Sequence, residues 1–407
     1  MKEFLRAVDV EEARAHARAF AVVADQQVTL SASHGRVLAA DFVADVDLPG
    51  FRRSTVDGYA VCASSTFGAT ESAPSPLTLV GAVDMGARAE GSVGPGQAAR
   101  ILTGGMLPTG ADAVVMVEHT EPIDKSTIEV TRPVTPHQHV IEPAEDVRAG
   151  DTLLARGTRL RPQEMGLLAA LGCPALRVFA RPRVAIVSTG DEIVPLEARP
   201  GPGQVRDINS CTLSAMVERS GAVPRPLGIV GDDFEALLAT CRAALLEADI
   251  VLLSGGSSVG SRDLTLAVLE ALPDSRVLFH GVAIQPGKPT ILADVGGKPV
   301  WGLPGHVASA MVVFHVLVRP QLEHICGAKP ARELRVSARL SRNVASVPGR
   351  RDYVRVRLEE RDDELWAVPT LGKSGLIRTM VDADGMVEID RDCEGLEQGS
   401  RVLVEPL

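Results

Sequence analysis

Residues 181–327 alternate short apolar segments with longer amphipathic ones, and this alternation constrains the fold more than any other feature of the chain. RVAIVS, PLGIV, DIVLLS and VWGL are typical of buried strands, and helical patterns such as FEALLATCRAALLEA stand between them. Strands separated by helices of this length form βαβ units. We therefore predict a central, doubly wound α/β domain with a mostly parallel sheet and helices on both of its faces.

The segments on either side have a different pattern. Residues from about 45 to 145 contain short β-rich stretches, such as AVVMVEHTE and STIEVTRPV, divided by proline and glycine. Residues 330–407 again show short strands with closely spaced turns. The predicted fold class is therefore multidomain α/β plus β: the central α/β domain, a β-rich insert domain and a C-terminal β-barrel or sandwich. We also expect a helix over residues 9–25, capped by Asp9, and another that begins near Pro162.

The composition disfavours several classes of partner. A formal charge of −10 argues against a general nucleic-acid-binding surface. No apolar run approaches the roughly 20 residues of a membrane span, and the N-terminus lacks the apolar core of a signal peptide. The six cysteines include no CxxC pair, which favours reduced thiols. We expect a cytoplasmic protein with neither nucleic-acid nor membrane partners.

Three unusual loops follow apolar strands of the α/β segment: STGDE at 188–192, SGGSSVGSRD at 254–263 and LPGH at 303–306. Ligands of open parallel sheets bind beyond the carboxyl ends of the strands, so the three loops are expected to converge on one edge. Two of them lead towards a helix, whose free amides favour an anion, and QPGKP adds Lys288. The glycines also suit a simple tight turn. Their spacing matches neither a Walker A loop nor a dinucleotide fingerprint, which disfavours a kinase or a dinucleotide enzyme.

Three carboxylates are expected at the same edge: Glu192, Asp232 and Asp263. Carboxylates beside anion-binding amides repel the anion unless a cation lies between them. Mg²⁺ suits this place because it takes one or two carboxylates together with phosphate oxygens. We therefore predict that the three residues bind Mg²⁺. Asp232 and Asp263 also suit the start of the helices that follow, and this structural role stays open for both.

Several further motifs extend the pattern beyond these loops. GQVRDIN and GLPG lie within the α/β segment, and STVDGYAV (54–61), RILTGGMLPTGADAVVMVE (100–118), AEDV (144–147), GTRLRPQEMGLLAALG (157–172) and GRRDYVRVRL (349–358) lie outside it. Together with STGDE, SGGSSVG and QPGKP, they resemble the molybdopterin molybdenumtransferases, the molybdenum-insertion proteins of molybdenum-cofactor synthesis, which are related to the C-terminal domain of gephyrin. The likeness covers nearly the whole chain in the right order.

The resemblance implies an elongated homodimer whose chains have four domains. They are residues 1–45 with 148–180, an N-terminal dimerisation domain; 46–147, the β-rich insert domain; 181–327, the α/β molybdopterin-binding domain; and 328–407, the C-terminal β-barrel domain.

The resemblance also implies an enzyme, a Mg²⁺-dependent molybdopterin molybdotransferase. It would insert molybdate into adenylylated molybdopterin and give molybdenum cofactor and AMP. Holding both substrates in one cleft removes the entropic cost of their encounter. The implied partners are a second copy of the chain, the enzyme that adenylylates molybdopterin, and the molybdoenzyme apoproteins that receive the cofactor.

Site residues follow from the same resemblance, position by position. Asp57 and Asp146 lie in or beside the insert and would complete the site from across the cleft, although Asp57 before Gly58 also suits a β-turn. The implied catalytic residues are Asp57, Asp146, Glu192, Asp232 and Asp263, of which Glu192, Asp232 and Asp263 are the metal ligands. The implied cofactor-binding residues are Thr103, Ser188, Thr189, Gly190, Asn209, Ser254, Gly255, Gly256, Ser257, Lys288, Pro304 and Gly305.

Several positions depart from the family pattern. His306 and Val307 stand where the family usually has asparagine and proline, Gln285 where lysine is common, Ala144 where glycine is usual, and Glu142 at a place that is normally basic. Several of these changes remove positive charge from a site that has to hold phosphates and molybdate. One alternative is therefore a divergent paralogue that binds or carries molybdopterin or the cofactor without efficient turnover. A second alternative, a molybdopterin adenylyltransferase, stays open because the α/β segment alone resembles the enzyme that adenylylates molybdopterin. Tungstate would suit such a site as well as molybdate, because the two oxyanions are nearly alike in size and charge.

Overall fold

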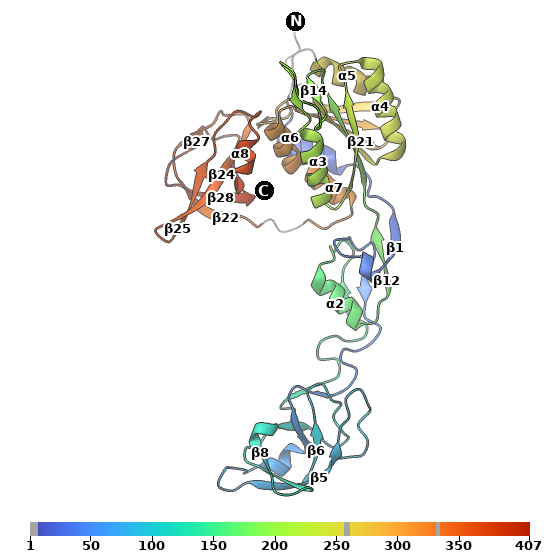
Figure 1. Cartoon of the computed structure of the whole chain (residues 1–407), viewed down its shortest axis with the longest axis vertical. Coiled ribbons are helices and arrows are strands. Elements are labelled where there is room, and N and C mark those ends of the chain that lie inside the picture. The colour runs from blue at the N-terminus through green and yellow to red at the C-terminus, as the bar shows by residue number, and fades with distance from the viewer. Residues whose placement is uncertain (1–6, 256–260, 331–333) are drawn as a thin grey trace. The chain divides into compact units, whose positions relative to one another are not determined.

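The computed structural model describes residues 7–255, 261–330 and 334–407, the side chains of residues 261–263 excepted. The chain divides into two compact units, which Figure 1 shows in ribbon form. Unit 1 consists of Met1–Ala40, Arg156–Arg161 and Ala175–Leu407, and unit 2 consists of Asp41–Ala155 and Pro162–Pro174. The division into four domains stays a prediction.

A six-stranded sheet forms the centre of unit 1. The order of its strands is β16 (Val223–Val230), β13 (Arg183–Thr189), β17 (Ile250–Gly255), β21 (Lys298–Leu303), β20 (Ile291–Val295) and β18 (Ser275–His280). The first four are parallel, whereas β20 and β18 run antiparallel to their neighbours. The mostly parallel sheet is confirmed, with an antiparallel edge in addition.

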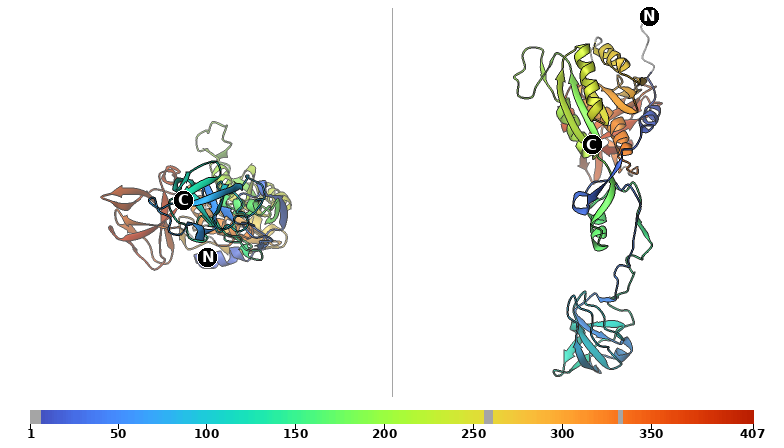
Figure 2. Two further views of the ribbon diagram at one scale, coloured as in Figure 1. Left: turned by 90° about the horizontal axis from the view of Figure 1, so that it is seen from below. Right: turned by 90° about the vertical axis from the view of Figure 1, so that its right-hand side faces the viewer.

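Helices cover both faces of this sheet because its strands are apolar on both sides. Ile186 and Leu252 belong to one buried cluster, and their neighbours Val187 and Leu253 belong to another, as the alternation of side chains along a strand requires. Figures 1 and 2 show the helices on the two sides, which confirms the doubly wound arrangement. The second cluster includes α4 (Phe234–Glu247) and α5 (Ser261–Ala271), and the first includes α1 (Val10–Arg18), α3 (Asn209–Arg219), α6 (Val307–Val313), the π-helix η4 (Phe314–Val318) and α7 (Arg319–Ile325).

The N-terminal helix is shorter than the sequence predicts. Asp9 caps it as expected, accepting a hydrogen bond from the backbone N–H of Glu11 at 2.7 Å. However, the helix ends at Arg18 because the apolar residues that follow Phe20 are packed against two buried clusters, and valines there favour an extended chain. The chain continues into β1 (Asp25–Thr29), which pairs with β12 (Ala175–Phe179), and then into the short 3₁₀ helix η1 (Leu30–Ala32).

The C-terminal part of unit 1 closes into a small β-barrel, as predicted. Five strands form a ring in the order β24 (Arg351–Arg361), β25 (Glu364–Pro369), β22 (Val336–Leu340), β28 (Arg401–Pro406) and β26 (Gly385–Ile389), and β26 pairs again with β24. Closure leaves these strands without free edges. A short strand of the α/β segment, β19 (Ile284–Gln285), adds in parallel to β24. The remaining elements here are β23 (Val344–Ala345), β27 (Gly395–Leu396) and α8 (Arg378–Val381).

Unit 2 contains the predicted β-rich insert. Its six-stranded sheet has the order β7 (Ala113–Met116), β4 (Gly58–Val61), β6 (Gln97–Ile101), β5 (Ser75–Ala82), β9 (Thr127–Val130) and β8 (Thr120–Pro122). The other elements are β2 (Phe42–Val43), β3 (Arg53–Ser54), β10 (Val140–Ile141), β11 (Thr152–Leu154), the 3₁₀ helices η2 (Ala63–Thr66) and η3 (Val117–His119), and α2 (Pro162–Ala170), which begins where the sequence predicts.

No helix in the described parts of the chain has both the length and the apolar character needed to cross a membrane. None of the six cysteines, all of which the structure describes, takes part in a disulfide.

A partly buried carboxylate connects the barrel to the α/β part of unit 1. Glu405 in β28 contacts Nε2 of His315 at 2.6 Å and accepts a hydrogen bond from Arg319 at 2.9 Å. Burial raises the pKa of Glu405, but the hydrogen bond and charge of His315, followed by the charges of Arg319 and Arg335, outweigh burial and lower the pKa from 4.5 to about 2. The ionised carboxylate thus stabilises the folded chain above pH 4.5, and this contribution is lost as the pH falls towards 2.

We expect Glu405→Gln to lower the free energy of unfolding at pH 7 by about 1–3 kcal/mol, after allowance for the partial exposure of the pair. The difference from the wild type should shrink as the medium is acidified below pH 4.5. Urea unfolding at neutral and at acidic pH measures both effects. Glu360→Gln, at an exposed position of β24, is the control and should behave as the wild type. A difference between Glu405→Gln and the wild type that grows on acidification would contradict this assignment.

Candidate functional site

The carboxyl ends of three parallel strands lie side by side at one edge of the α/β sheet. The register places Ser188 of β13 beside Ser254 of β17, and Ser254 beside Leu303 of β21. The loops STGDE, SGGSSVGSRD and LPGH begin at these three ends. In the second loop, Gly256 and Ser257 lie outside the described residues. The structure therefore brings together the described beginnings of all three loops.

Asn209, the first residue of α3, links two of these strand ends. Its side-chain amide donates one hydrogen bond to Oγ of Ser254 at 2.7 Å and another to the carbonyl oxygen of Gly305 at 2.8 Å. The other side-chain atom of Asn209, Oδ1, and Oγ of Ser188 are buried and have no hydrogen-bond partner among the described residues. Unsatisfied buried polar atoms are costly. A polar ligand group bound at this edge would satisfy both of them.

A cavity of about 320 Å³ opens beside these atoms. Its polar lining includes Ser188, Asn209 and Ser254 from the strand ends. Its apolar lining includes Ile193 of β14 (Ile193–Val194), Val205 of β15 (Val205–Arg206) and Ile208. A lining that combines apolar side chains with a few polar groups suits a small molecule with an apolar part and a polar part.

Two glycines at this edge have backbone conformations that favour glycine, and at Gly255 the backbone of Thr189 also leaves no room for a side chain. Gly255 has a φ of +147°, and a Cβ atom there would lie 1.9 Å from the carbonyl oxygen of Thr189. Gly190 has a φ of +140°, and its Cβ would lie 2.7 Å from the carboxylate of Glu192. Only glycine adopts such a conformation without strain. The tight-turn explanation therefore accounts for these two glycines whether or not a ligand is bound.

Acidic side chains gather next to the end of β13. The backbone N–H of Asp232 donates a hydrogen bond to Oδ1 of Asp191 at 3.0 Å. Burial, followed by the charges of Asp191 and Glu192, raises the pKa of Asp232. A bound cation would relieve this repulsion. Sequence reasoning missed Asp191, although it directly precedes Glu192 in STGDE.

Asp263 belongs to α5, but its side chain lies outside the described residues, so its place in the cluster stays a prediction. Among the side chains that the structure describes, no group of three histidine, cysteine, aspartate or glutamate residues has the geometry of a metal site. The capping role that the sequence left open for Asp232 belongs to Asp233, which accepts a hydrogen bond from the N–H of Ala236 at 2.7 Å.

Three further predicted residues of unit 1 lie at different places: two are at the strand ends and one is outside both cavities. Thr189 and Pro304 are buried at the strand ends. Lys288 is exposed and is not among the residues that line this cavity or the second one, described below.

In unit 2, Asp57 and Thr103 lie together at the ends of β4 and β6. The backbone N–H and the hydroxyl of Thr103 both donate to Oδ1 of Asp57, each at 2.7 Å. These hydrogen bonds lower the pKa of Asp57, so its exposed carboxylate stays ionised. Asp146 is also exposed, and its backbone N–H donates to the carbonyl oxygen of Leu48 at 3.1 Å.

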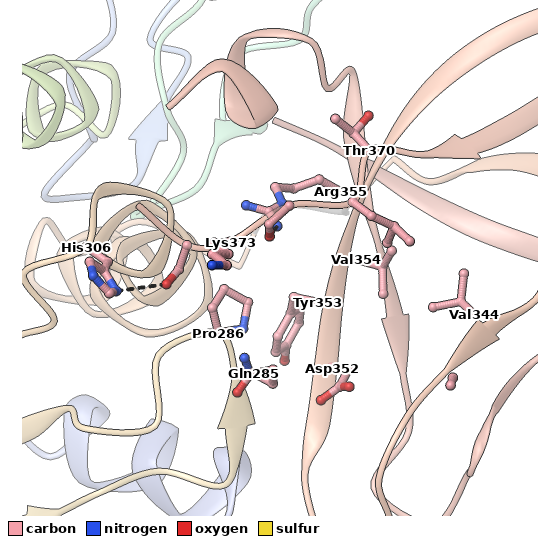
Figure 3. A pocket seen from close by; sticks show the side chains of 14 residues that line it. Gln285, Pro286, His306, Val344, Asp352, Tyr353, Val354, Arg355, Thr370 and Lys373 are labelled. Carbon is pink, nitrogen blue, oxygen red and sulfur yellow. Dashed lines mark hydrogen bonds between the residues drawn. The ribbon is translucent and has the colours of Figure 1, made fainter. Parts of the chain in front are cut away.

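A second cavity, of about 480 Å³, lies between the barrel and the α/β part of unit 1. Figure 3 shows Gln285 and Pro286 on one side, and Tyr353 and Arg355 of β24 on the other. His306 lines both this cavity and the first one.

Comparison with known proteins finds matches to successive parts of the chain. The chain matches three family models: the MoeA N-terminal region (domain I and II) over residues 8–172, a probable molybdopterin binding domain over residues 185–324, and the MoeA C-terminal region (domain IV) over residues 337–407. The chain belongs to the MoeA family. The resemblance drawn from the sequence motifs is thereby confirmed.

Relatives with curated names support this membership. The chain is 34% identical over 383 residues to molybdopterin molybdenumtransferase 2 of Mycobacterium tuberculosis, covering 93% of this chain and 94% of the relative. It is 32% identical over 381 residues to the molybdopterin molybdenumtransferase of Bacillus subtilis, covering 93% and 88%. Among solved structures, the molybdopterin biosynthesis moeA protein of Pyrococcus horikoshii OT3 is similar with a TM-score of 0.86 and 32% identity, covering 99% of this chain and 100% of that one.

We expect Asn209→Ala to lower the free energy of unfolding by about 1–3 kcal/mol, because Ser254 and Gly305 would lose the donor that joins them. Ser214→Ala, in the same helix, is the control and should change this quantity by less than about 0.5 kcal/mol. Urea unfolding of the three chains measures the difference. If Asn209→Ala were as stable as the control, the amide would not hold the strand ends together.

Proposed function

We propose that this chain is a molybdopterin molybdenumtransferase, which uses molybdate and adenylylated molybdopterin to form molybdenum cofactor and release AMP. The observation that carries the proposal is the strand-end cavity, where buried polar atoms without described partners lie beside an acidic cluster. The names of relatives that align with nine-tenths of the chain support the same reaction.

The cavity at the strand ends would bind the nucleotide-linked pterin. Oγ of Ser188 and Oδ1 of Asn209 offer hydrogen bonds to its polar groups, and the apolar residues of the same cavity suit a flat ring. Fixing this substrate on rigid strand ends would orient its reacting groups before molybdate arrives. We assign supporting roles in binding to the other predicted residues, which are Thr189, Gly190, Ser254, Gly255, Gly256, Ser257, Lys288, Pro304 and Gly305.

We propose that Mg²⁺ is held by Glu192, Asp232 and Asp263, with Asp191 as a neighbouring carboxylate. The donor set fits, because Mg²⁺ prefers carboxylate oxygens and because the pKa of Asp232 is raised by burial and then by the negative charges of Asp191 and Glu192. When bound, the ion would neutralise charge between these carboxylates and the substrate phosphates. The positions of the carboxylates determine where the positive charge of the ion would lie.

We further propose that the chain works as a homodimer in the cytoplasm. Asp57, Thr103 and Asp146 of one subunit would then serve the cavity of the other. The two hydrogen bonds from Thr103 support a functional role, since they hold the exposed carboxylate of Asp57 ionised and in one orientation. The adenylylating enzyme and molybdoenzyme apoproteins are the proposed partners that supply the substrate and accept the product.

Release of AMP from adenylylated molybdopterin tests the reaction. We expect the wild type to release AMP when low molybdate and Mg²⁺ are both present. We expect Glu192→Gln to reduce kcat/KM by about 100-fold, because a carboxylate proposed to hold Mg²⁺ beside the phosphates is lost. Glu235→Gln, an exposed neighbour in the first turn of α4, is the matched control and should be as active as the wild type.

Each alternative function gives a different outcome in the same assay. A chain that binds adenylylated molybdopterin but releases no AMP with molybdate is a carrier. A chain that transfers AMP from ATP to molybdopterin is an adenylyltransferase. Either result contradicts the proposed function.

Mixed dimers test whether two subunits share a site. Co-expressed Asp57→Asn and Glu192→Gln chains should regain about a quarter of wild-type activity, because half of randomly formed dimers are mixed and each of these has one intact site. Asp57→Asn co-expressed with the double variant Asp57→Asn/Glu192→Gln is the control, because none of its sites is intact. Recovery no greater than in this control would show that each chain builds its own site.

A further inference from the structure

Among the described residues, His306 is the one that lines both the strand-end cavity and the larger cavity between the barrel and the α/β part. It directly precedes α6 and is exposed. It is also a position at which the chain departs from the family pattern. A residue that lines both cavities can affect how groups bound in them are placed relative to each other.

The contacts of His306 lead to one loop of the barrel, residues 370–376. Nδ1 of His306 and Oγ of Ser374 form a hydrogen bond of 2.9 Å, drawn as a dashed line in Figure 3. The N–H of Ala308, in the first turn of α6, donates to the carbonyl oxygen of Ser374 at 3.0 Å. A Cβ atom on Gly375 would lie 3.6 Å from Cδ2 of His306, so the imidazole ring packs against this glycine. The barrel loop is therefore docked on the start of α6.

The barrel loop is a wall of both cavities. Lys373 and Ser374 line the larger cavity, between the barrel and the α/β part, and Gly375 lines the strand-end cavity. If the loop moves away from α6, the walls of the two cavities change together. A reaction between two bound substrates is sensitive to such a change, because small errors of position are costly in rate.

We propose that His306 is a positioning residue: its hydrogen bond to Ser374 holds the barrel loop against α6, and the loop in turn fixes the wall that it contributes to the strand-end cavity, where the nucleotide-linked pterin is proposed to bind, together with its wall of the larger cavity. The inference rests on the proposed function for its effect on rate. The contact itself does not depend on that function. The Ala308 hydrogen bond remains when the imidazole is removed, so His306→Ala is expected to fold with a loosened loop.

Two measurements test the proposal. Limited trypsin digestion, followed by mass spectrometry, reports on the loop through cleavage of the Lys373–Ser374 bond, with the exposed Lys125–Ser126 bond of unit 2 as an internal reference. Steady-state release of AMP reports on kcat and KM separately. The chains to compare are the wild type, His306→Ala, His306→Asn, Ser374→Ala and the double variant His306→Ala/Ser374→Ala, with His34→Ala as a control at an exposed histidine far from the loop in sequence.

We expect His306→Ala to increase cleavage at Lys373, relative to cleavage at Lys125, about fivefold, because opening of the barrel loop becomes easier. It should lower kcat about tenfold while the KM for either substrate changes less than about threefold. Ser374→Ala should have the same effects, and the double variant should be no worse than either single one, since both remove the same hydrogen bond. His306→Asn keeps a side-chain hydrogen-bonding group and should recover most of kcat.

Unchanged cleavage at Lys373 in His306→Ala would overturn the contact. Increased cleavage with an unchanged kcat, a change in KM alone, or His306→Asn no better than His306→Ala would overturn the positioning role. A wild type that releases no AMP would refute the proposed function and the effect on rate with it, while the cleavage rates would still decide whether His306 holds the loop.

Discussion

The side-chain amide of Asn209 is the interaction on which the strand-end site depends. It donates to the Ser254 hydroxyl and to the Gly305 carbonyl, and so ties the ends of β17 and β21 to the start of α3. Parallel strands bring these residues to one edge, but the fold alone does not fix their polar atoms. The amide does so, and it leaves its own oxygen and the nearby Ser188 hydroxyl buried beside the cavity without described partners. The site therefore combines a rigid scaffold with unsatisfied hydrogen-bonding capacity, the combination that favours binding of a polar ligand.

Electrostatics impose the second constraint. Burial of Asp232, together with the nearby charges of Asp191 and Glu192, raises the pKa of Asp232. Such a cluster does not attract phosphates or an oxyanion by itself. A divalent cation among the carboxylates reconciles the acidic cluster with anionic substrates. Cationic side chains also line both cavities: Arg206 lines the strand-end cavity, and Arg355 and Lys373 line the larger one together with Asp352.

The parts of the fold that depend on local patterns could be predicted from the sequence. Apolar runs such as RVAIVS and DIVLLS predict buried strands because both of their faces pack against helices. The end of α1 could not be predicted in this way, because it depends on packing of Phe20 and the following valines against distant segments. The same limit applies to the site. Its loops could be located from strand ends, and Asp191 lies within one of them and could have been included. The Asn209 hydrogen bonds and the contact between His306 and Ser374 join residues through long-range geometry that no spacing encodes.

An experimental structure of the chain with adenylylated molybdopterin and Mg²⁺ tests the central claim most directly. The account predicts that the substrate occupies the strand-end cavity, with polar groups in hydrogen-bond contact with Oγ of Ser188 and Oδ1 of Asn209 and with the metal ion between its phosphates and the carboxylates of Glu192 and Asp232. Substrate bound elsewhere on the chain, with Ser188 and Asn209 still without a polar partner, would contradict it.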